Sequence, residues 1–341
     1  MRRPSRLPAI LPIPTLQQPV PAPVVDVPNR QPHHWHWMRA QVTKNEHRSG
    51  VVAVIGRPNT GKSTLVNAFV DEKISIVTSK PQTTRHSIMG ILTEPDVQIV
   101  FVDTPGLHGG SARLINRAMN RAAAASMIGA DLALFVTDAT GWKRGDDHAL
   151  SRLQEAGIPA FLIINKLDLL KRRQDLLPVL EKFSARGDFI EVVPISAQGG
   201  TNLERLLDTI RQSMPVGPQL FPSDTKTDRS MEFRIGEIMR EKMLMLLHEE
   251  VPYGLAVEVL QIERRPDLIL VDAVVWVERE SHQGIVVGRG GEKIKRISTL
   301  AREDLEKIFA RRFYMTSRVK VKENWSDNAR ALRQLGYEES L

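Results

Sequence analysis

The stretch "GRPNTGKST" at residues 56–64 follows a short apolar run at residues 51–55 and precedes a stretch with helical spacing. Its two glycines, its lysine and its serine match the pattern G-x-x-x-x-G-K-S/T, which forms a phosphate-binding loop where it joins a strand to a helix. The glycines let the backbone curve closely around phosphates, with successive N–H groups pointing inward. Lys62 is expected to bridge the β- and γ-phosphates, and the Ser63 hydroxyl to hold Mg²⁺.

The region from residue 50 to residue 214 alternates apolar runs with amphipathic stretches. The runs are rich in β-branched residues, have the length of strands and occupy residues 51–55, 98–103, 132–138, 160–166 and 190–196. The stretches with helical spacing occupy residues 63–70, 113–128, 148–156 and 202–214. This alternation predicts an α/β domain with a mostly parallel sheet and helices on both faces. Ligands bind such a sheet beyond the carboxyl ends of its strands, where the phosphate loop lies.

A second motif, "DTPG" at residues 103–106, ends another apolar run. Asp103 is expected near the metal, acting through water, because its carboxylate ends a strand at the edge where the phosphate loop lies. Gly106 can offer its N–H to a γ-phosphate because no side chain blocks the approach. Alone this motif is weak, but paired with the phosphate loop at this distance it indicates a nucleotide switch.

The base is predicted from "NKLD" at residues 165–168. The Asp168 carboxylate can accept two hydrogen bonds from guanine, whereas adenine offers no matching pair of donors and would leave the carboxylate unpaired. The alkyl stem of Lys166 can lie along the base. "ISA" at residues 195–197 ends the next strand, where a backbone N–H can reach the guanine oxygen. The order of these motifs predicts guanine nucleotide binding.

The segment "SKPQTTRHS" at residues 79–87 lies between the first two motifs. A threonine hydroxyl here would complete the Mg²⁺ shell when a triphosphate is bound, as in a switch loop. Thr83 and Thr84 are both candidates that the sequence does not separate, and we favour Thr84. A plain surface loop is the alternative.

A second domain is expected after a linker at residues 215–230, which is rich in Pro, Asp and Thr. Its stretches come in the order helix, strand, strand, helix, helix, strand. The bounds we expect are a first helix at 231–250, strands at 254–263 and 268–279, a long helix through about residue 312 and a last strand at 314–322. The order predicts a compact α+β domain over residues 231–330, followed by a tail at 331–341.

A glycine loop between a strand-like region and a helix fits the pattern G-x-x-G, with the residues Gly288, Arg289, Gly290 and Gly291. Residues 284–322 contain eleven Lys or Arg and four Asp or Glu. This arrangement is typical of a KH module, where such a loop clamps a single-stranded backbone and apolar residues line the groove for the bases. The cations that would add attraction for phosphates are Lys293, Lys295 and Arg296. The alternative is an αβ domain with a solvated basic helix.

The bulk composition agrees with two domains in a reducing compartment. The chain has 341 residues, no cysteine, a net charge of +7 and a pI of 9.7. Disulfides and thiolate metal sites are thereby excluded, and the charge favours an anionic partner, either nucleic acid or a membrane surface. No apolar run approaches the roughly 18 residues that span a bilayer.

Residues 1–49 form a separate, proline-rich segment, which we interpret as a disordered extension. Three of its histidines, at positions 33, 34 and 36, lie close together, but they have no carboxylate or cysteine beside them that would suggest a metal site. The alternatives for this segment are a targeting peptide and an over-long reading frame that starts upstream of the true start at Met38.

The motifs together resemble the Era family of bacterial GTPases. They are "GRPNTGKSTLVN", "QTTRH", "DTPGLH", "NKLD" and "PISA", followed by "VVGRGGEKIK", and the resemblance extends from about residue 50 to the end through "TDRS", "HEEVPY" and "RALRQLGY". It implies a P-loop GTPase domain followed by a KH domain. It also implies binding of GTP and GDP with Mg²⁺, binding of 16S rRNA near its 3′ end, and a role in 30S subunit maturation. The expected protein is a cytoplasmic monomer with a fraction peripherally associated with the inner membrane.

The site residues expected on this basis fall into three sets. The nucleotide-binding set is Gly56, Arg57, Pro58, Asn59, Thr60, Gly61, Lys62, Ser63, Asp103, Thr104, Pro105, Gly106, Leu107, Asn165, Lys166, Leu167, Asp168, Ser196 and Ala197. The catalytic set is Lys62, Thr84 and Gly106, and the Mg²⁺ set is Ser63, Thr84 and Asp103. The RNA-binding set is the glycine loop with the three cations beside it.

Two residues bear on the chemistry. In Ras a glutamine after the D-x-x-G motif orients the attacking water, but here Leu107 takes that position and its side chain forms no hydrogen bonds. We therefore expect slow intrinsic hydrolysis. Asn59 matches the asparagine that in related GTPases helps to hold a monovalent cation, so K⁺ is a further candidate cofactor.

Two rival hypotheses remain. The chain could be a scaffold for RNA or membrane that binds guanine nucleotide with negligible turnover, or its basic C-terminal domain could bind a membrane surface. The glycine loop favours RNA, because a membrane patch needs no tight turn.

Overall fold

The structure is a computed structural model that describes residues 46–107, 113–248 and 251–337. Residues 1–45 of the expected extension, with the histidines at positions 33, 34 and 36, lie outside the described residues, as do the histidine after Leu107 and the last four residues of the expected tail. None of the helices in the described ranges has the length and apolar character that a membrane span needs.

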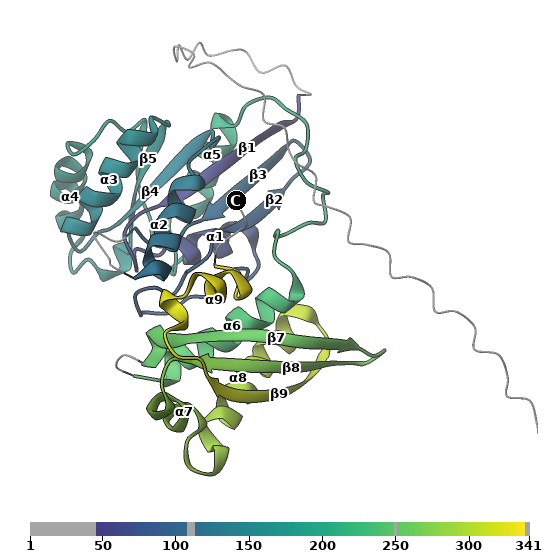
Figure 1. Cartoon of the computed structure of the whole chain (residues 1–341). Helices are drawn as coiled ribbons and strands as arrows, with labels where there is room; N and C mark the ends of the chain where they lie inside the picture. Colours follow the sequence, from purple (N-terminus) through teal and green to yellow (C-terminus); the bar gives the residue numbers. More distant parts are fainter. Residues whose placement is uncertain (1–45, 108–112, 249–250, 338–341) are drawn as a thin grey trace, which may run out of the picture. The chain divides into compact units, whose positions relative to one another are not determined.

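The first part of the described chain forms a six-stranded sheet (Figure 1). The strand order is β2-β3-β1-β4-β5-β6, and only β2 runs antiparallel to its neighbour. The strands are β1 (Arg48–Ile55), β2 (Ile88–Thr93), β3 (Val97–Asp103), β4 (Leu132–Asp138), β5 (Ala160–Asn165) and β6 (Glu191–Pro194). Every residue of β3, β4 and β5 is buried, as continuous apolar runs in a sheet covered on both faces require.

Helices cover both faces of this sheet. Their bounds are α1 (Lys62–Val70), α2 (Leu114–Ala125), α3 (Arg144–Ala156), α4 (Leu176–Ser184) and α5 (Leu203–Ser213). Residues of α1 and α5 share one hydrophobic cluster with the sheet, and residues of α2, α3 and α4 share another with its opposite face. The predicted α/β class is confirmed, with the antiparallel β2 and the helix α4 as additions.

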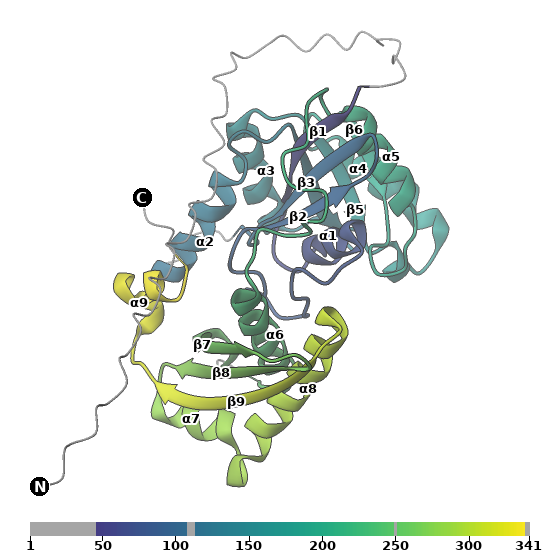
Figure 2. The same cartoon turned by 90° about the vertical axis from the view of Figure 1, so that its right-hand side faces the viewer.

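The second part is an α+β unit around a three-stranded sheet of order β7-β8-β9 (Figure 2). Its elements are α6 (Met231–Leu246), β7 (Leu255–Arg264), β8 (Leu268–Val277), α7 (Glu280–Val287), α8 (Glu292–Phe309), β9 (Arg312–Val321) and α9 (Ala329–Gln334). β7 and β8 are antiparallel, whereas β8 and β9 are parallel. Helices α6, α7 and α8 bury their apolar residues in one cluster against the inner face of this sheet.

Three expectations for the second part need correction. The region before the glycine loop is not strand-like but forms the helix α7. The long helix ends at Phe309, because Ala310 adopts a left-handed conformation with φ of 49° that breaks the helical hydrogen-bond pattern. β9 therefore begins at Arg312, two residues earlier than expected.

The segments expected to be a linker and a tail both contact folded elements. In the expected linker, the backbone N–H groups of Leu220 and Phe221 donate to the Gln98 side chain in β3 at 2.7 and 2.8 Å. In the expected tail, Leu332 of α9 is buried in a cluster that includes Met119 of α2. Short 3₁₀ turns occur at Leu167–Leu169, Arg173–Asp175, Val251–Gly254, Arg289–Gly291 and Trp325–Asp327.

Candidate functional site

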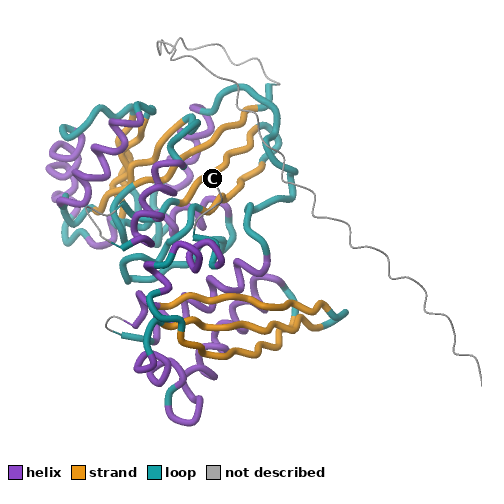
Figure 3. The backbone as a smooth tube through the Cα atoms, in the orientation of Figure 1, coloured by secondary structure: helices purple, strands orange, loops and turns teal. Residues whose placement is uncertain are grey.

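The phosphate loop joins β1 to α1 at the carboxyl edge of the sheet, among the loops drawn in teal in Figure 3. Gly56 has φ of 155°, and a Cβ there would lie 2.3 Å from the carbonyl oxygen of Val136. Gly61 has φ of 95°, and a Cβ there would lie 2.2 Å from the side-chain nitrogen of Asn165. Both positions therefore require glycine, because any side chain would collide with β4 or with the base-reading loop.

Lys62 begins α1 and turns its ammonium back into the loop. Its Nζ donates to the carbonyl oxygens of Gly56 at 3.1 Å and Arg57 at 3.0 Å. Burial lowers the pKa of Lys62 to about 8, although the nearby Asp103 charge acts in the opposite direction. The ammonium is thus held inside the loop, where phosphate oxygens are the natural partners for its charge.

The expected Mg²⁺ ligands come together from three segments. The Ser63 Oγ lies 2.8 Å from the Thr84 Oγ1. Asp103 at the end of β3 is fully buried, and neither of its carboxylate oxygens has a hydrogen-bond partner among the described residues. Burial raises the pKa of Asp103, and the nearby Ser63 hydroxyl and the charge of Lys62 oppose that shift. Two hydroxyls and an unpaired buried carboxylate are oxygen donors of the kind that Mg²⁺ prefers, so the residues fit this ion.

The two threonines of the switch loop differ in their surroundings. The Thr83 Oγ1 donates to the carbonyl oxygen of Lys80 at 2.7 Å and lies 2.6 Å from the Thr78 Oγ1. Thr84, in contrast, is the one beside Ser63. The geometry supports Thr84 as the metal-binding threonine.

The base-reading loop is braced by Asn165 at the end of β5. Its Nδ2 donates to the carbonyl oxygen of Thr60 at 2.8 Å, and its Oδ1 accepts from the backbone N–H of Ala197 at 2.9 Å. Asp168 is exposed, and one of its carboxylate oxygens accepts a hydrogen bond from the Ser196 hydroxyl. Asn165 is therefore occupied as a brace, whereas the Asp168 carboxylate faces solvent, where a base can reach it.

The "DTPG" segment packs tightly under the phosphate loop. A Cβ on Gly106 would lie 2.6 Å from the backbone nitrogen of Pro58, so only glycine lets the two backbones approach. The Thr104 Oγ1 donates to the carbonyl oxygen of Val54 at 2.7 Å. Leu107 is 4% exposed and belongs to the cluster formed with α2, α3 and α4. Its side chain thus points into the core.

An ion-pair network beside the loop is absent from the sequence-based prediction. The side chain of Arg57, a residue expected to bind nucleotide, is occupied by protein contacts: its Nε donates to Asp146 in α3 at 3.0 Å, and its Nη2 lies 3.6 Å from Asp138. Lys166 also pairs with Asp138, at 2.9 Å, and donates to the carbonyl oxygen of Asn59 at 2.6 Å. Burial raises the pKa of Asp138, but hydrogen bonds from Thr140 and Lys166 outweigh it and leave the pKa below its usual value.

Asn59 stands at the outer turn of the phosphate loop. It has a left-handed φ of 62°, and its Nδ2 donates to the carbonyl oxygen of Ser79 at 2.6 Å. The side chain thereby links the phosphate loop to the switch loop. Thr60 is buried, and its Oγ1 donates to the carbonyl oxygen of Arg57 at 3.2 Å.

The glycine loop of the second part joins α7 to α8. Gly288, Gly290 and Gly291 have φ of 72°, 55° and 82°, which favour glycine. A Cβ on Gly290 or Gly291 would meet no atom within 4 Å, so this backbone is open to approach by a ligand. Lys295 and Arg296 are exposed on the first turn and a half of α8. The loop and these two cations are thus accessible together.

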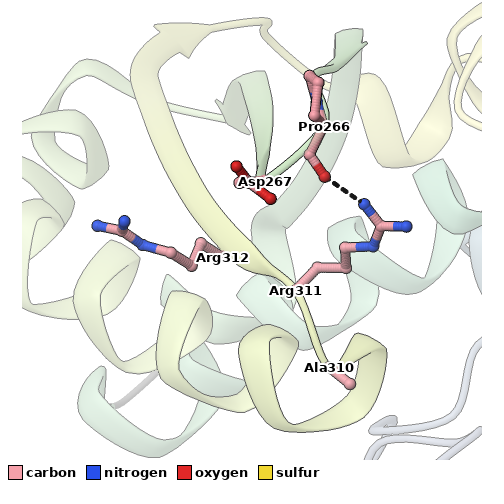
Figure 4. A pocket seen from close by; sticks show the side chains of 5 residues that line it. All are labelled: Pro266, Asp267, Ala310, Arg311 and Arg312. Atoms are coloured by element: carbon pink, nitrogen blue, oxygen red, sulfur yellow. Dashed lines mark hydrogen bonds between the residues drawn. The ribbon is translucent and has the colours of Figure 1, made fainter.

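A separate hollow lies at the other end of α8, between the β7–β8 turn and the start of β9 (Figure 4). It has a volume of about 630 Å³. The Arg311 guanidinium donates to the carbonyl oxygen of Pro266 at 2.6 Å across it. No residue of the expected sites lines this hollow.

Comparisons with known proteins place both parts of the chain. Residues 51–166 match the model of the 50S ribosome-binding GTPase family, and residues 250–326 match a KH domain model. GTPase Era of Coxiella burnetii is 47% identical over 290 residues, covering 85% of this chain and 98% of the relative. GTPase Era of Stenotrophomonas maltophilia is 46% identical over 292 residues, covering 86% and 98%.

Solved Era structures are similar over the same extent. A crystal structure of Era in complex with MgGDPNP and nucleotides 1506–1542 of 16S ribosomal RNA aligns with a TM-score of 0.83 and 35% identity, covering 86% of this chain and all of that one. A point variant of Aquifex aeolicus Era bound to GDP·AlF₄⁻ gives the same TM-score and identity. The chain therefore belongs to the Era family and is a GTPase with a GTPase domain followed by a KH domain.

Proposed function

We propose that the chain is a slow GTP-dependent switch that binds the 3′ region of 16S rRNA through its KH domain and assists maturation of the 30S subunit. The observation that carries this proposal is the likeness, over 86% of the chain, to an Era structure that holds MgGDPNP and 16S rRNA nucleotides together. Residues of this chain also support RNA binding, because the glycine loop is open and the cations beside it are exposed.

Each nucleotide contact is assigned to residues of the first domain. Lys62 binds the β- and γ-phosphates, and Gly106 offers its N–H to the γ-phosphate. Asp168 accepts hydrogen bonds from the guanine base while Lys166 covers its face. Ser63 and Thr84 would hold Mg²⁺, as would Asp103 through water, and the ion would neutralise charge that develops on the phosphates.

Slow turnover is supported by the position of Leu107. Its buried side chain neither forms hydrogen bonds nor points toward the phosphates, so no residue at this position orients the attacking water. The water is then positioned by backbone groups or by a partner. We expect phosphate release over multiple turnovers to be slow for the protein alone and faster with 30S subunits. No turnover in either condition would favour the rival scaffold hypothesis.

K⁺ is proposed as a further cofactor at Asn59. The Asn59 side chain stands beside the phosphate loop, where its Nδ2 donates to the carbonyl oxygen of Ser79, and its amide oxygen is the atom that would bind the cation. A monovalent cation there would add positive charge near the phosphates. The expected result is a higher GTPase rate in K⁺ than in Na⁺ buffer, and a loss of that difference in Asn59→Ala. Equal rates in the two buffers would contradict the proposal.

The RNA contact is tested by binding to an RNA with the sequence of 16S nucleotides 1506–1542. Lys295→Glu/Arg296→Glu should weaken binding and flatten its salt dependence, since each lost phosphate contact removes roughly 0.7 from the log–log slope for a single strand. Arg152→Glu/Lys182→Glu changes the net charge equally at exposed positions of the first domain and serves as the matched control. Equal losses for both variants would show a general charge effect and overturn the assignment.

We also propose a cytoplasmic monomer with a peripherally membrane-associated fraction. The net charge of +7 supports attraction to an anionic surface. Flotation with anionic but not with neutral vesicles is the expected result, and flotation abolished by the same RNA would show that the KH domain is the surface used. The oligomeric state is measured by sedimentation.

A further inference from the structure

The residues that flank Thr84 are fastened to the KH domain from both sides. On one side, the Arg240 guanidinium in α6 donates to the carbonyl oxygen of Thr83. Arg240 is 1% exposed and is paired with Glu237, one turn earlier in the same helix, by bonds of 2.6 and 2.7 Å. The arginine is therefore rigidly held in its own domain before it reaches the switch loop.

On the other side, Arg85 reaches out of the switch loop into the KH domain. Its guanidinium donates to the backbone carbonyls of Leu255 at 2.7 Å and Tyr253 at 2.9 Å, and it lies over the ring of Trp325. Arg85 is 2% exposed. Carbonyl groups bound by a buried guanidinium form charge-assisted hydrogen bonds, which are stronger than neutral ones.

The contacts of Arg240 and Arg85 fix the backbone on both sides of Thr84 and thereby set the position of its hydroxyl. The carbonyl held by Arg240 belongs to the peptide unit that leads into Thr84, and the guanidinium of Arg85 anchors the residue that follows. Between these two anchors, the Thr84 Oγ1 lies 2.8 Å from the Ser63 Oγ. Released from the anchors, the peptide unit could rotate and carry the hydroxyl away from Ser63.

We propose that Arg240, a residue of the KH domain, is a positioning residue for the GTP site, which holds the Thr83 carbonyl so that the Thr84 hydroxyl stays beside Ser63. This inference rests on the proposed role of Thr84 as a ligand of Mg²⁺ in the triphosphate complex. Because a switch threonine meets the metal only when the γ-phosphate is present, the contribution of Arg240 falls on GTP and not on GDP. By thermodynamic linkage, a bound triphosphate stabilises the hydrogen bond between Arg240 and the Thr83 carbonyl by the same factor by which this bond raises the affinity for the triphosphate.

The test compares the affinities of the full-length protein for GDPNP and for GDP in the presence of Mg²⁺. Arg240→Met removes the donor, and Glu237→Gln/Arg240→Met does so without leaving a buried carboxylate unpaired. The expected result for both is a loss of GDPNP affinity of about tenfold, the order of one charge-assisted hydrogen bond, with GDP affinity unchanged. Arg240→Lys, which keeps the charge and one donor, should recover part of the loss.

Arg234→Met is the matched control. Arg234 lies on the same helix and also crosses to the first domain, where its guanidinium pairs with Glu72 at 2.5 Å, but within the described chain it forms no hydrogen bond to residues 83–86. Its GDPNP-to-GDP affinity ratio should stay within about twofold of the wild type. An equal fall of that ratio in the control would reduce the effect to general loosening between the domains and overturn the proposal.

Thr84→Ala separates the inference from the proposed function. If Thr84→Ala weakens GDPNP binding and the Arg240 variants do not, the metal role of Thr84 stands and the positioning role of Arg240 is wrong. If Thr84→Ala leaves the affinity for GDPNP unchanged, the metal role itself is wrong and the inference falls with it. Loss of GDPNP affinity in Thr84→Ala and in both Arg240 variants, with GDP unaffected, supports both.

Discussion

The side-chain amide of Asn165 donates a 2.8 Å hydrogen bond to the carbonyl oxygen of Thr60. This bond ties the base-reading loop after β5 to the phosphate loop after β1, across 105 residues of sequence. The Oδ1 of the same side chain accepts from Ala197 after β6. One buried amide thus holds three loops together. The loop after β1 binds the phosphates, and the loops after β5 and β6 bind the base, so their relative positions must be kept.

Replacing Asn165 by Ala should weaken GDP and GTP binding to the same extent. The change removes buried hydrogen bonds and leaves the Thr60 carbonyl unpaired, a cost of about 1–3 kcal/mol, or roughly ten- to a hundredfold in affinity. Titration with labelled GDP and GDPNP measures both constants. Thr209→Ala, which removes one exposed hydroxyl in α5, is the control. A loss confined to the triphosphate would contradict the bracing role.

Replacing Asp168 by Asn should exchange guanine for xanthine. The asparagine amide keeps one acceptor for the N1–H of the base but replaces the other acceptor by an N–H donor. This donor would face the exocyclic amine of guanine, which is also a donor, whereas xanthine has a carbonyl oxygen at that position and can accept the bond. GDP affinity should fall by roughly a hundredfold or more while XDP gains. Competition against labelled nucleotide measures both, with ADP as the control that stays weak. Unchanged discrimination would show that Asp168 does not read the base edge.

The core elements of both domains could be predicted from the sequence because their patterns are local. Continuous β-branched runs indicated β3, β4 and β5, and spacing indicated the order of the KH elements. β2 was missed because six residues between a switch loop and a turn carry little periodic signal. α4 was missed because Pro178 reads as a helix breaker, although Pro is tolerated in the first turn, where it stands.

Residues of the nucleotide site could be predicted from the sequence only where they belong to a recognisable motif. The pattern G-x-x-x-x-G-K-S identifies Lys62 and Ser63, but it does not reveal that Arg57 pairs with Asp146, which lies 89 residues away. The bond from Arg240 to Thr83 spans 157 residues and has no local signature at all. Contacts between elements far apart in sequence depend on tertiary packing, so such residues emerge only from the structure.

Nucleotide affinity should fall at alkaline pH because of Lys62. Its pKa of about 8 in the free protein means that the ammonium loses its proton above that pH, whereas phosphate binding requires the charged form. The dissociation constant for GDP, measured in EDTA to exclude metal, should be flat below pH 7 and rise up to about tenfold per pH unit above pH 8. Lys62→Arg keeps its charge and should show a flat profile, although ionisation of the base would affect both proteins alike. Parallel profiles would contradict this account.

The stability of the protein should fall in mild acid because of His86. Burial lowers the pKa of His86 to about 4, with Arg229, Arg240 and Arg85 adding to the shift and Glu237 opposing it; the ring stacks on Tyr337 at 4.4 Å. Between the unfolded value of 6.5 and this folded value, only the unfolded state binds the proton, so stability is present above pH 6.5 and is lost as the pH falls toward 4.

The expected loss is about 1.4 kcal/mol per pH unit in that window, up to roughly 3 kcal/mol in the free energy of unfolding. Carboxylates titrate in the same range, so the quantity to measure is the difference between the wild type and His86→Phe, which keeps an aromatic ring against Tyr337. The midpoints of urea unfolding of both proteins at pH 7.5, 6.0 and 5.0 give this difference in stability. The wild type should lose more stability than the variant over this range, and midpoints that fall in parallel would show that His86 binds its proton at the same pH in the folded and the unfolded protein.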